Sequence, residues 1–334
     1  MADTTNIEWA DSTWNPWIGC SAVSPGCDNC YAADWAKRYG RDFSERTKTA
    51  DWAKPKRWNA APFFQCSSCG KRGDGLQFGL GGQGQATPLC PSCTSHDILP
   101  ARRRVFPSLC DPFDNQVPEV WRAQLFALIM ETPNIDWLLL TKRIGYAHKL
   151  IGGFHSVPLL PNIWLGATIV NQAEADRDIP KLLDIPARVR FLSMEPLLGP
   201  VNLTRLPHED GGSGDALAGE VWVETWLDDA GTQRQRCAVG EYGRLDWVIV
   251  GGESGPNARP MSPEWARSLR DQCRAAGVPY LFKQWGEWIP MLGQAEGLPV
   301  RNKIAMPDGW VMGFAGKKAT GRLLDGQLHD AWPS

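Results

Sequence analysis

Residues 135–141 read IDWLLLT, a short apolar run that ends in a polar residue, and four other stretches of the chain follow a similar pattern. Short runs rich in branched, aromatic and leucine side chains are typical of strands that are buried on both faces of a parallel sheet. The other runs are NIWLGAT at 162–168, RVRFLSM at 188–194, DWVIVGG at 246–252 and VPYLFKQ at 278–284. A sixth, less clear run precedes Cys20.

Stretches with helical periodicity separate these runs, at residues 118–131, 172–183 and 263–276. The last one opens with Ser-Pro-Glu, a capping serine followed by proline at the first helical position, and it stops at Gly277. The alternation of strand and helix predicts an α/β chain with a parallel sheet and right-handed crossovers. About six such units favour a partial (β/α)6, TIM-like barrel.

Two stretches interrupt this alternation, and we interpret both as insertions. Residues 60–100 carry two cysteine pairs around a Gly/Gln-rich middle, and residues 205–245 alternate like a β-hairpin with an Asp-Ala-Gly turn. The predicted organisation is the first barrel elements with a cysteine loop at 1–59, a zinc-ribbon-like insertion at 60–100, barrel at 101–204, a hairpin insertion at 205–245, and the last barrel elements with a C-terminal extension at 246–334.

The composition excludes several classes of protein. The chain has 334 residues, of which 43% are hydrophobic, so it can bury a sizeable core and is neither disordered nor fibrous. It has no run of about 18 apolar residues, and its first residues lack the pattern of a secretion signal. We therefore expect a cytoplasmic protein with no membrane partner. In a reducing compartment its 10 cysteines do not form a disulfide framework, so their spacing carries the information.

Cys20, Cys27 and Cys30 form the first cysteine group, with the spacing C-x6-C-x2-C. Three thiolates can hold a 4Fe-4S cluster and leave one iron open for another ligand. The loop runs into a predicted helix from Tyr31 to Tyr39, and a helix N-terminus favours anionic thiolates. The alternatives are a structural zinc site completed by a distant His or Cys, or buried thiols without a metal.

Cys66, Cys69, Cys90 and Cys93 form the second group, with the spacing C-x2-C-x20-C-x2-C. Two such pairs bring four sulfurs into the tetrahedron that zinc accepts, which predicts a small ribbon that depends on its metal for folding. The alternatives are a second iron-sulfur cluster or a redox pair.

The formal net charge of -2 conceals a basic segment, because residues 51–110 hold eight Lys or Arg against three Asp. The run Arg102-Arg103-Arg104 lies in this segment, and it could either bind the phosphates of a nucleic acid or simply be solvated.

Polar residues follow the predicted strands, at the ends where parallel α/β barrels place their chemistry. Glu195, Glu253 and Lys283 are the catalytic candidates, although the sequence assigns no definite role to any of them. The candidates for substrate binding are three cations that suit a carboxylate or phosphate and one indole: Lys142, Arg143, Arg259 and Trp285. Further indoles that could line a cavity are Trp14, Trp17 and Trp288. The histidines form no pair with ligand spacing, so a His-based metal hydrolase is unsupported.

The three-cysteine loop after a first strand, followed by about five strand and helix units, resembles the radical S-adenosylmethionine superfamily. The usual spacing there is C-x3-C-x2-C, and the loop of this chain is longer by three residues. The chain as a whole resembles a bacteriophage-associated family of uncharacterised three-Cys-motif proteins. The stretches that carry this resemblance are TWNPWIGCSAVSPGCDNCYA, DWLLLTKR, PNIWLGATIVNQ, RFLSMEPLLGPV, DWVIVGGESGPNARPM, LFKQWGEW and GKKATGRLLDG.

The resemblance implies a 4Fe-4S cluster on Cys20, Cys27 and Cys30, S-adenosylmethionine at the open iron, and an electron donor as partner. A GGE-like turn holds the amino group of the cofactor in many members of the superfamily, where it follows an early strand rather than a late one. The residues of this chain that the resemblance and the strand ends assign to the cofactor are Tyr31, Thr168, Glu195, Gly251, Gly252, Glu253 and Ser254.

The phage association, the predicted zinc ribbon and the basic segment suggest a nucleic acid or a nucleotide as substrate, modified or repaired by hydrogen abstraction. One alternative is a non-catalytic, zinc-dependent nucleic-acid-binding phage protein in which both cysteine groups are structural zinc sites. Another is an iron-sulfur nuclease or an enzyme that depends on a partner.

Overall fold

The computed structural model of the chain describes residues 2–80, 87–152, 161–208, 212–227, 233–294 and 297–333. The chain divides into two compact units, each assembled from three segments. The first unit comprises Met1–Ser21, Asp42–Leu139 and Leu159–Trp164, and the second comprises Ala22–Arg41, Leu140–Pro158 and Leu165–Ser334. The first cysteine group is therefore shared, because Cys20 lies in the first unit whereas Cys27 and Cys30 lie in the second.

A seven-stranded sheet has the hydrogen-bonded order β1-β7-β8-β9-β10-β15-β16. Its strands are β1 (Ser12–Thr13), β7 (Arg103–Phe106), β8 (Ile135–Thr141), β9 (Ile163–Thr168), β10 (Val189–Met194), β15 (Trp247–Gly251) and β16 (Tyr280–Gln284). The pairs β1–β7, β7–β8, β10–β15 and β15–β16 are parallel. The chain is thus a mixed α/β protein whose parallel sheet is consistent with a partial barrel.

The five apolar runs of the sequence are confirmed as strands β8, β9, β10, β15 and β16. The sixth, less clear run contains the short strand β1. Strand β7 is not among the predicted strands, because two of its four residues are arginines.

Aromatic rings explain how arginines can stand inside strand β7, where Arg103 and Arg104 are both buried. The guanidinium of Arg103 lies over the rings of Trp58 and Phe63, at 5.3 and 4.5 Å from their centroids. Its Nη1 also donates a hydrogen bond to Ser12 Oγ at 2.9 Å. The π faces and the hydroxyl compensate for the lost hydration of the cation. These two arginines are therefore part of the sheet, and they are neither solvated nor exposed to a phosphate.

Carboxylates neutralise much of the remaining basic segment within the first unit. Arg102 pairs with Asp136 at 3.1 Å, and Arg72 pairs with Asp11 at 2.9 Å. Other basic side chains of the segment make similar pairs: Lys54 with Asp3, Lys56 with Glu131, and Arg57 with Asp51. The local excess of positive charge in the sequence is thus compensated mainly by acids from outside the segment: Asp3, Asp11, Glu131 and Asp136.

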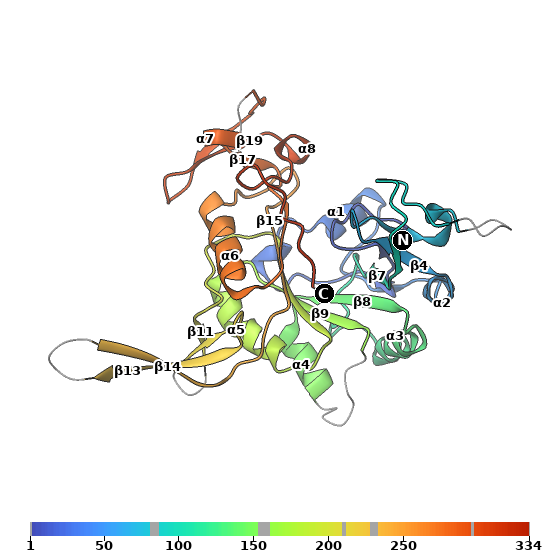
Figure 1. Cartoon of the computed structure of the whole chain (residues 1–334), viewed down its shortest axis with the longest axis horizontal. Helices are drawn as coiled ribbons and strands as arrows, with labels where there is room; N and C mark the ends of the chain where they lie inside the picture. The colour runs from blue at the N-terminus through green and yellow to red at the C-terminus, as the bar shows by residue number, and fades with distance from the viewer. Residues whose placement is uncertain are drawn as a thin grey trace. The chain divides into compact units, whose positions relative to one another are not determined.

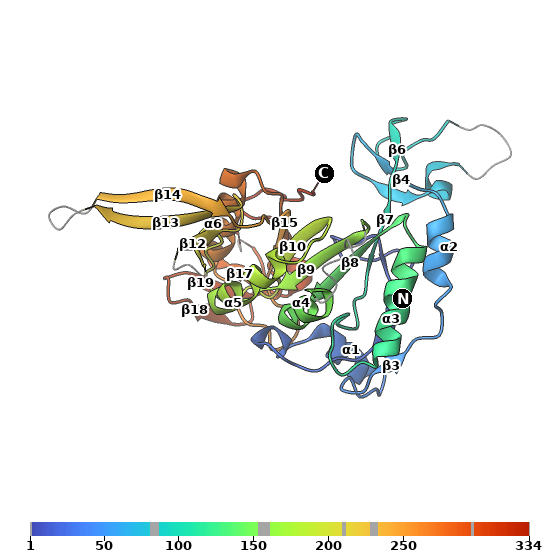
Figure 2. The ribbon, with the colours of Figure 1, turned by 90° about the horizontal axis from the view of Figure 1, so that it is seen from below.

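The first unit also holds small antiparallel sheets, in which β2 pairs with β3 and β4 lies between β5 and β6. Helices α2 and α3 lie side by side (Figure 2). The bounds are β2 (Trp17–Ile18), β3 (Thr47–Lys48), α2 (Lys54–Ala60), β4 (Phe63–Cys66), β5 (Arg72–Asp74), η2 (Gly75–Phe78), β6 (Ile98–Pro100) and α3 (Glu119–Glu131). Trp14 and Trp17 are fully buried, and Trp14 packs edge-on against Trp137, so these two indoles belong to the core and do not line an open cavity.

The predicted helices of the second unit are confirmed as α1 (Tyr31–Arg38), α5 (Gln172–Leu183) and α6 (Pro263–Ala276). Helix α4 (Ile144–Gly152) and the short helix η1 (Pro25–Cys27) are not among the predicted helices. Helix α6 has both predicted caps, since Ser262 Oγ accepts from the N–H of Glu264 and Gly277 adopts a positive φ of 66°. It packs on β15 (Figure 1) and on β16.

Two further antiparallel sheets complete the second unit, with the orders β11-β12-β13-β14 and β17-β19-β18. The predicted hairpin corresponds to β13 and β14, which pair in antiparallel fashion, and its Asp-Ala-Gly turn lies outside the described residues. The sequence analysis predicts no element for the region after Trp285. The bounds are β11 (Leu206–Pro207), β12 (Ser213–Asp215), β13 (Glu220–Leu227), β14 (Gln233–Glu241), β17 (Trp288–Pro290), α7 (Met291–Gln294), β18 (Lys303–Ala305), β19 (Val311–Phe314) and α8 (Lys317–Thr320).

The C-terminal segment from Thr320 onward fastens the edge strand β16 and the loop after it. The N–H of Phe282 donates to His329 O at 2.8 Å, and Trp247 Nε1 donates to Ala331 O at 2.9 Å. Thr320 Oγ1 donates to Gly286 O at 2.6 Å. The end of β16 is therefore held in place by residues that come late in the chain.

Gly166 of β9 allows close packing in the core of the second unit. A Cβ at this position would lie 2.3 Å from Cζ of Phe191 on the neighbouring strand β10. We therefore expect Gly166→Ala to lower the free energy of unfolding by about 1–3 kcal/mol, because the ring must move. Phe191→Leu should restore part of this loss in the double variant.

Chemical denaturation measures both effects. The matched control is Gly145→Ala in α4, where a Cβ would meet only the side chain of Lys181 at 3.6 Å. This control should stabilise the protein by about 0.5–1 kcal/mol. A Gly166→Ala variant as stable as the unmodified protein would contradict this account of the packing.

Candidate functional site

Four cysteines of the first unit gather their sulfur atoms in one place. The Sγ atoms of Cys66 and Cys93 are 3.6 Å apart, and those of Cys69 and Cys90 are 3.5 Å apart. All four sulfurs lie within 4.8 Å of one another. Among the described residues, this is the one group of three or more Cys, His, Asp or Glu close enough to hold a metal ion. The predicted quartet is therefore brought together by the fold.

The two halves of this cysteine quartet have the same kind of backbone turn. The N–H of Cys66 donates to Lys71 O at 2.8 Å, and the N–H of Cys90 donates to Ser95 O at 2.9 Å. Each turn returns the chain so that both cysteines of a pair face the same point. The apolar support comes from Phe78, which is fully buried against Cys66 and Cys90.

The residue after the second cysteine of each pair has a left-handed backbone. Gly70 has a φ of 75°, and Thr94 has a φ of 57°. Glycine adopts this conformation freely, whereas a β-branched residue is strained there. The backbone of the turn that contains Thr94 is therefore more strained than that of the turn that contains Gly70.

Backbone amides prepare the quartet for a cation. Burial opposes the charged form of Cys90, but the N–H groups of Ser92 and Cys93 outweigh it and lower the pKa of Cys90 to about 6. The N–H of Ser95 favours a thiolate at Cys93, yet the sulfurs of the neighbouring cysteines and burial raise the pKa of Cys93 to about 12. Four sulfurs at this distance cannot all ionise without a compensating positive charge. The quartet therefore fits a metal such as zinc, which accepts four thiolates in a tetrahedron.

Cys20 lies in a tightly held loop of the first unit. Its N–H donates to Phe43 O at 2.9 Å, and the N–H of Gly19 donates to Leu109 O at 3.1 Å. Gly19 has a φ of 118°, and a Cβ there would lie 2.1 Å from Glu45 O. Only glycine fits this close approach, so the residue before Cys20 fixes the path of the loop.

Cys110, which belongs to neither cysteine group of the sequence, lies beside this loop, where it forms a parallel bridge with Gly19. Burial, together with the neighbouring Asp111 and Cys20, raises the pKa of the Cys110 thiol well above its ordinary value of 9.0. Cys110 is therefore kept as a neutral thiol.

Cys27 and Cys30 flank a tight turn of the second unit. The N–H of Cys30 donates to Cys27 O at 3.2 Å, and Cys30 occupies the N-cap position of α1. Because Cys20 belongs to the first unit, a common cluster on the three cysteines stays a prediction.

The Cys27–Cys30 turn contacts residues at the carboxyl ends of β8, β9 and β15. A Cβ at Gly26 would lie 2.8 Å from Val170 and 3.4 Å from Cε of Lys142, which follow β9 and β8. Arg259, in the segment after β15, donates to Pro25 O at 2.8 Å. The turn is thus seated at the edge of the sheet where an α/β protein places its chemistry.

Glu253 joins the loop after β15 to the cysteine turn. Its buried carboxylate accepts from Nη2 and Nε of Arg259 at 2.6 and 2.9 Å, and from the N–H of Arg259 at 2.8 Å. Asn29 Nδ2, between the two cysteines, donates to the same carboxylate at 3.0 Å. Arg259 Nη1 pairs with Asp28 at 2.9 Å. We refer to Glu253, Arg259, Asn29 and Asp28 as the latch.

The donors of the latch stabilise the charged form of Glu253. Burial disfavours its charge, but the hydrogen bonds from Arg259 and Asn29 outweigh that effect and hold the pKa of Glu253 below its ordinary value of 4.5. The resemblance assigns Glu253 to the cofactor. In the structure its carboxylate already accepts four hydrogen bonds from donors of the chain, three of them at Oε2 and one at Oε1, which makes it a positioning residue.

Glu195 and Lys283 form a second ion pair at the strand ends, with Glu195 Oε2 and Lys283 Nζ 2.7 Å apart. The pair reaches across Gly251, where a Cβ would lie 3.1 Å from Glu195 Oε2. Ser193 Oγ donates to Glu195 Oε1 at 3.4 Å, and the Glu195–Pro196 peptide is cis. Two of the catalytic candidates are therefore brought together, from β10 and β16.

Two buried oxygens at the same strand ends have no hydrogen-bond partner among the described residues: Thr168 Oγ1 and Gln284 Oε1. Their side chains are only 4% and 6% exposed. Gln284 Nε2 donates to Ser254 Oγ at 2.9 Å, which leaves its oxygen unmatched. An unsatisfied buried polar atom costs about 1–3 kcal/mol. These oxygens therefore point to a bound group or water that would supply the missing partner.

The other predicted site residues have varied surroundings. Trp285 is buried in the core and donates from Nε1 to Leu323 O at 2.8 Å, so its indole does not line a substrate cavity. Gly252 must be glycine, because a Cβ would lie 1.9 Å from Trp285 O. Tyr31 is exposed on the first turn of α1. The N–H of Arg143 donates to Thr141 Oγ1 at the start of α4.

Sequence reasoning missed the latch partners Asp28 and Asn29 and the oxygen of Gln284. The only available signal was the polar pair between two cysteines.

No helix in the described part of the chain is long and apolar enough to cross a membrane.

Comparisons with known proteins give one match. A family model described as "Protein of unknown function (DUF5131)" matches residues 4–333, nearly the whole chain. No curated protein and no solved structure matches the chain.

Thr94→Gly tests the strain in the cysteine quartet. We expect it to raise the zinc affinity by about tenfold, because relief of a left-handed β-branched residue is worth about 1–2 kcal/mol. Gly70→Thr should lower the affinity by a similar factor, and Cys69→Ser should abolish stoichiometric zinc binding. Competition against a chromophoric chelator measures all three. Equal affinities for the two backbone variants would contradict the argument.

Glu253→Gln tests the latch. It should weaken the seating of the cysteine turn by about 1.5–3 kcal/mol, because hydrogen bonds to a charged group are lost. The alkylation rates of Cys27 and Cys30 by iodoacetamide should rise, as followed by peptide mass spectrometry. Glu264→Gln, at an exposed glutamate that pairs with Arg267, is the control and should leave these rates unchanged.

Lowering the pH should also weaken the seating of the cysteine turn in the unmodified protein. Because the pKa of Glu253 is lowered in the folded state, the latch contributes its full stability above about 4.5 and loses it as the pH falls through the lowered value. The hydrogen-exchange protection of residues 25–31, taken relative to the intrinsic exchange rate at each pH, should therefore fall on acidification in the unmodified protein more than in Glu253→Gln.

Proposed function

The chain belongs to the DUF5131 family of proteins of unknown function, and from this premise we propose that it is a radical S-adenosylmethionine-type iron-sulfur enzyme. The substrate we propose is a nucleic acid or nucleotide, modified or repaired by hydrogen abstraction. The observation that carries the proposal is the seating of the Cys27–Cys30 turn on strand ends that also hold a partly buried ion pair and two unmatched oxygens.

The residues that would hold a 4Fe-4S cluster are Cys20, Cys27 and Cys30. Their chemistry fits, because all three are free thiols that are neither deeply buried nor fully exposed. Cys30 lies at the N-cap position of α1. When bound, the cluster would supply one electron to split S-adenosylmethionine, which gives methionine and a deoxyadenosyl radical that abstracts hydrogen from the substrate.

The side chains of the protein itself would bind and orient the cofactor and the substrate. Thr168 Oγ1 and Gln284 Oε1 need partners, and hydroxyl or amine groups of a cofactor or substrate would satisfy them. Lys283 carries the charge for a carboxylate or phosphate, and Glu195 carries the charge for an amine, once their mutual pair opens. The latch keeps the cysteine turn in place throughout. Water exclusion would come from the buried surroundings of these side chains.

The finer architecture and setting belong to the same proposal. We take the parallel sheet as a (β/α)6-type partial barrel, with residues 60–100 as a zinc ribbon and residues 205–245 as a hairpin insertion. A reducing cytoplasm suits nine free cysteines in the described part of the chain, and an electron donor would be a partner.

The rival is a non-catalytic zinc protein that binds nucleic acid. The cysteine quartet alone is equally compatible with that rival, so the first cysteine group decides between them.

Anaerobic reconstitution with iron and sulfide tests the proposal. We expect a brown protein with about four irons beyond the zinc of the quartet, and release of deoxyadenosine after reduction with S-adenosylmethionine present. Cys27→Ala should lose the iron absorbance and keep the zinc. The matched control is Cys273→Ala, which removes a buried thiol of α6 and should keep both metals.

Two results would overturn the proposal. A colourless protein that binds about two zinc ions supports the non-catalytic rival. An iron content that Cys27→Ala leaves unchanged would place the cluster elsewhere in the chain.

A further inference from the structure

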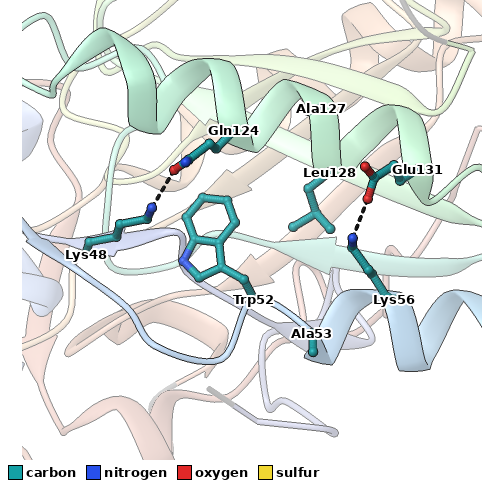
Figure 3. A pocket seen from close by; sticks show the side chains of 8 residues that line it. All are labelled: Lys48, Trp52, Ala53, Lys56, Gln124, Ala127, Leu128 and Glu131. Carbon is teal, nitrogen blue, oxygen red and sulfur yellow. Dashed lines mark hydrogen bonds and ion pairs between the residues drawn. The ribbon is translucent and has the colours of Figure 1, made fainter.

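A groove in the first unit lies between helix α3 and the segment that leads from β3 into α2 (Figure 3). Its volume is about 460 Å³, which is within the range of small-molecule sites. The residues that line it are Lys48, Trp52, Ala53, Lys56, Gln124, Ala127, Leu128 and Glu131. None of the residues assigned to the proposed catalytic site lines this groove.

Two polar bridges define the ends of the groove. At one end Lys48 Nζ donates a hydrogen bond to Gln124 Oε1, and at the other Lys56 pairs with Glu131 at 2.5 Å. Figure 3 shows both bridges reaching from the α2 side to α3. The Lys56–Glu131 pair is more than half exposed, so it is weakly held and can exchange partners.

The wall between the bridges is aromatic and apolar. The indole of Trp52 points toward α3, with Leu128 beside it (Figure 3). Trp52 is fixed on its other sides, because Nε1 donates to Thr49 O at 2.8 Å and Trp14 packs edge-on at 5.2 Å. The small side chains of Ala53 and Ala127 leave the remaining space open. This is a preformed platform for a flat ring.

The charge of the groove favours an anion. Lys48 is half-buried, and in the described part of the chain no carboxylate lies within ion-pair distance of it. The partners that it does have are a neutral amide and the face of Trp52, 4.8 Å from its Nζ. A partly desolvated ammonium with neutral partners gains strongly from a phosphate. Lys56, once released from Glu131, adds a second cation.

We propose that this groove binds one nucleotide unit, with its base on Trp52 and its phosphate on Lys48. A flat base suits the indole, and the anion suits the end of the groove where the unpaired charge lies. The inference adds to the proposed function a nucleotide contact in the first unit, whereas the strand-end residues belong to the second. It rests on the proposed function only for the identity of the ligand in the cell, because binding here needs no cluster.

Calorimetric titration of the full chain with 5′-AMP, adenosine and inorganic phosphate tests the proposal. We expect saturable binding of AMP, about tenfold weaker binding of adenosine, and no saturation with phosphate alone. Lys48→Gln should reduce AMP binding to the level of adenosine, because it removes the charge. A short single-stranded oligodeoxynucleotide in a second arm tells a strand from a free nucleotide: tighter binding with the same dependence on Lys48 assigns the groove to a strand.

Ala127→Leu fills the groove and should abolish binding of AMP. Ala123→Leu is the matched control, because it makes the same change at an exposed position one turn earlier on α3, and it should bind AMP normally. Binding that Ala127→Leu and Lys48→Gln leave unchanged would overturn the proposal, and so would the absence of AMP binding. The same titration of Cys27→Ala separates the two hypotheses, since AMP should still bind when the iron is lost.

Discussion

A buried carboxylate and the guanidinium that compensates it hold the candidate site together. Glu253 and Asn29 are 224 residues apart in the sequence, yet they meet in the latch with Arg259. A buried glutamate without these donors would be strongly destabilising, so the loop after β15 and the cysteine turn are stable only as a pair. Glu287 extends the arrangement, because its N–H donates to Glu253 O and its carboxylate accepts from the N–H of Gly255.

The two cysteine groups show two ways of presenting thiols. The quartet is self-contained, because its four cysteines come from two matching turns of one unit. Cys20 belongs to the first unit, whereas Cys27 and Cys30 belong to the second. The loops of these three cysteines are positioned by other residues of their own unit, by Phe43 for Cys20 and by Arg259 for the Cys27–Cys30 turn. Four close sulfurs are typical of a structural metal site.

Local patterns predicted the parts of the structure that depend on neighbours in sequence. Apolar runs marked five strands, cap residues marked both ends of α6, and the spacing of Cys66 to Cys93 marked the quartet. Long-range contacts defeated prediction. From its local sequence Arg103 is expected at the surface, but in the fold it is buried against the rings of Trp58 and Phe63. Trp285 is expected to contact a ligand, but its N–H donates to Leu323 O instead. Glu253 is expected to bind a ligand, but its carboxylate accepts hydrogen bonds from Arg259.

The clasp of residues 320–331 on β16 has a temporal meaning. A protein is synthesised from its N-terminus, so the contacts of Thr320, His329 and Ala331 form after the rest of the sheet has left the ribosome. The loop that carries Glu287, and through it the seat of Glu253, is complete only then. The four cysteines of the quartet and the strands β4, β5 and β6 beside them all lie within residues 63–100, so they are synthesised long before the clasp. The order of synthesis would therefore make the cysteine quartet available first and the seat of Glu253 last.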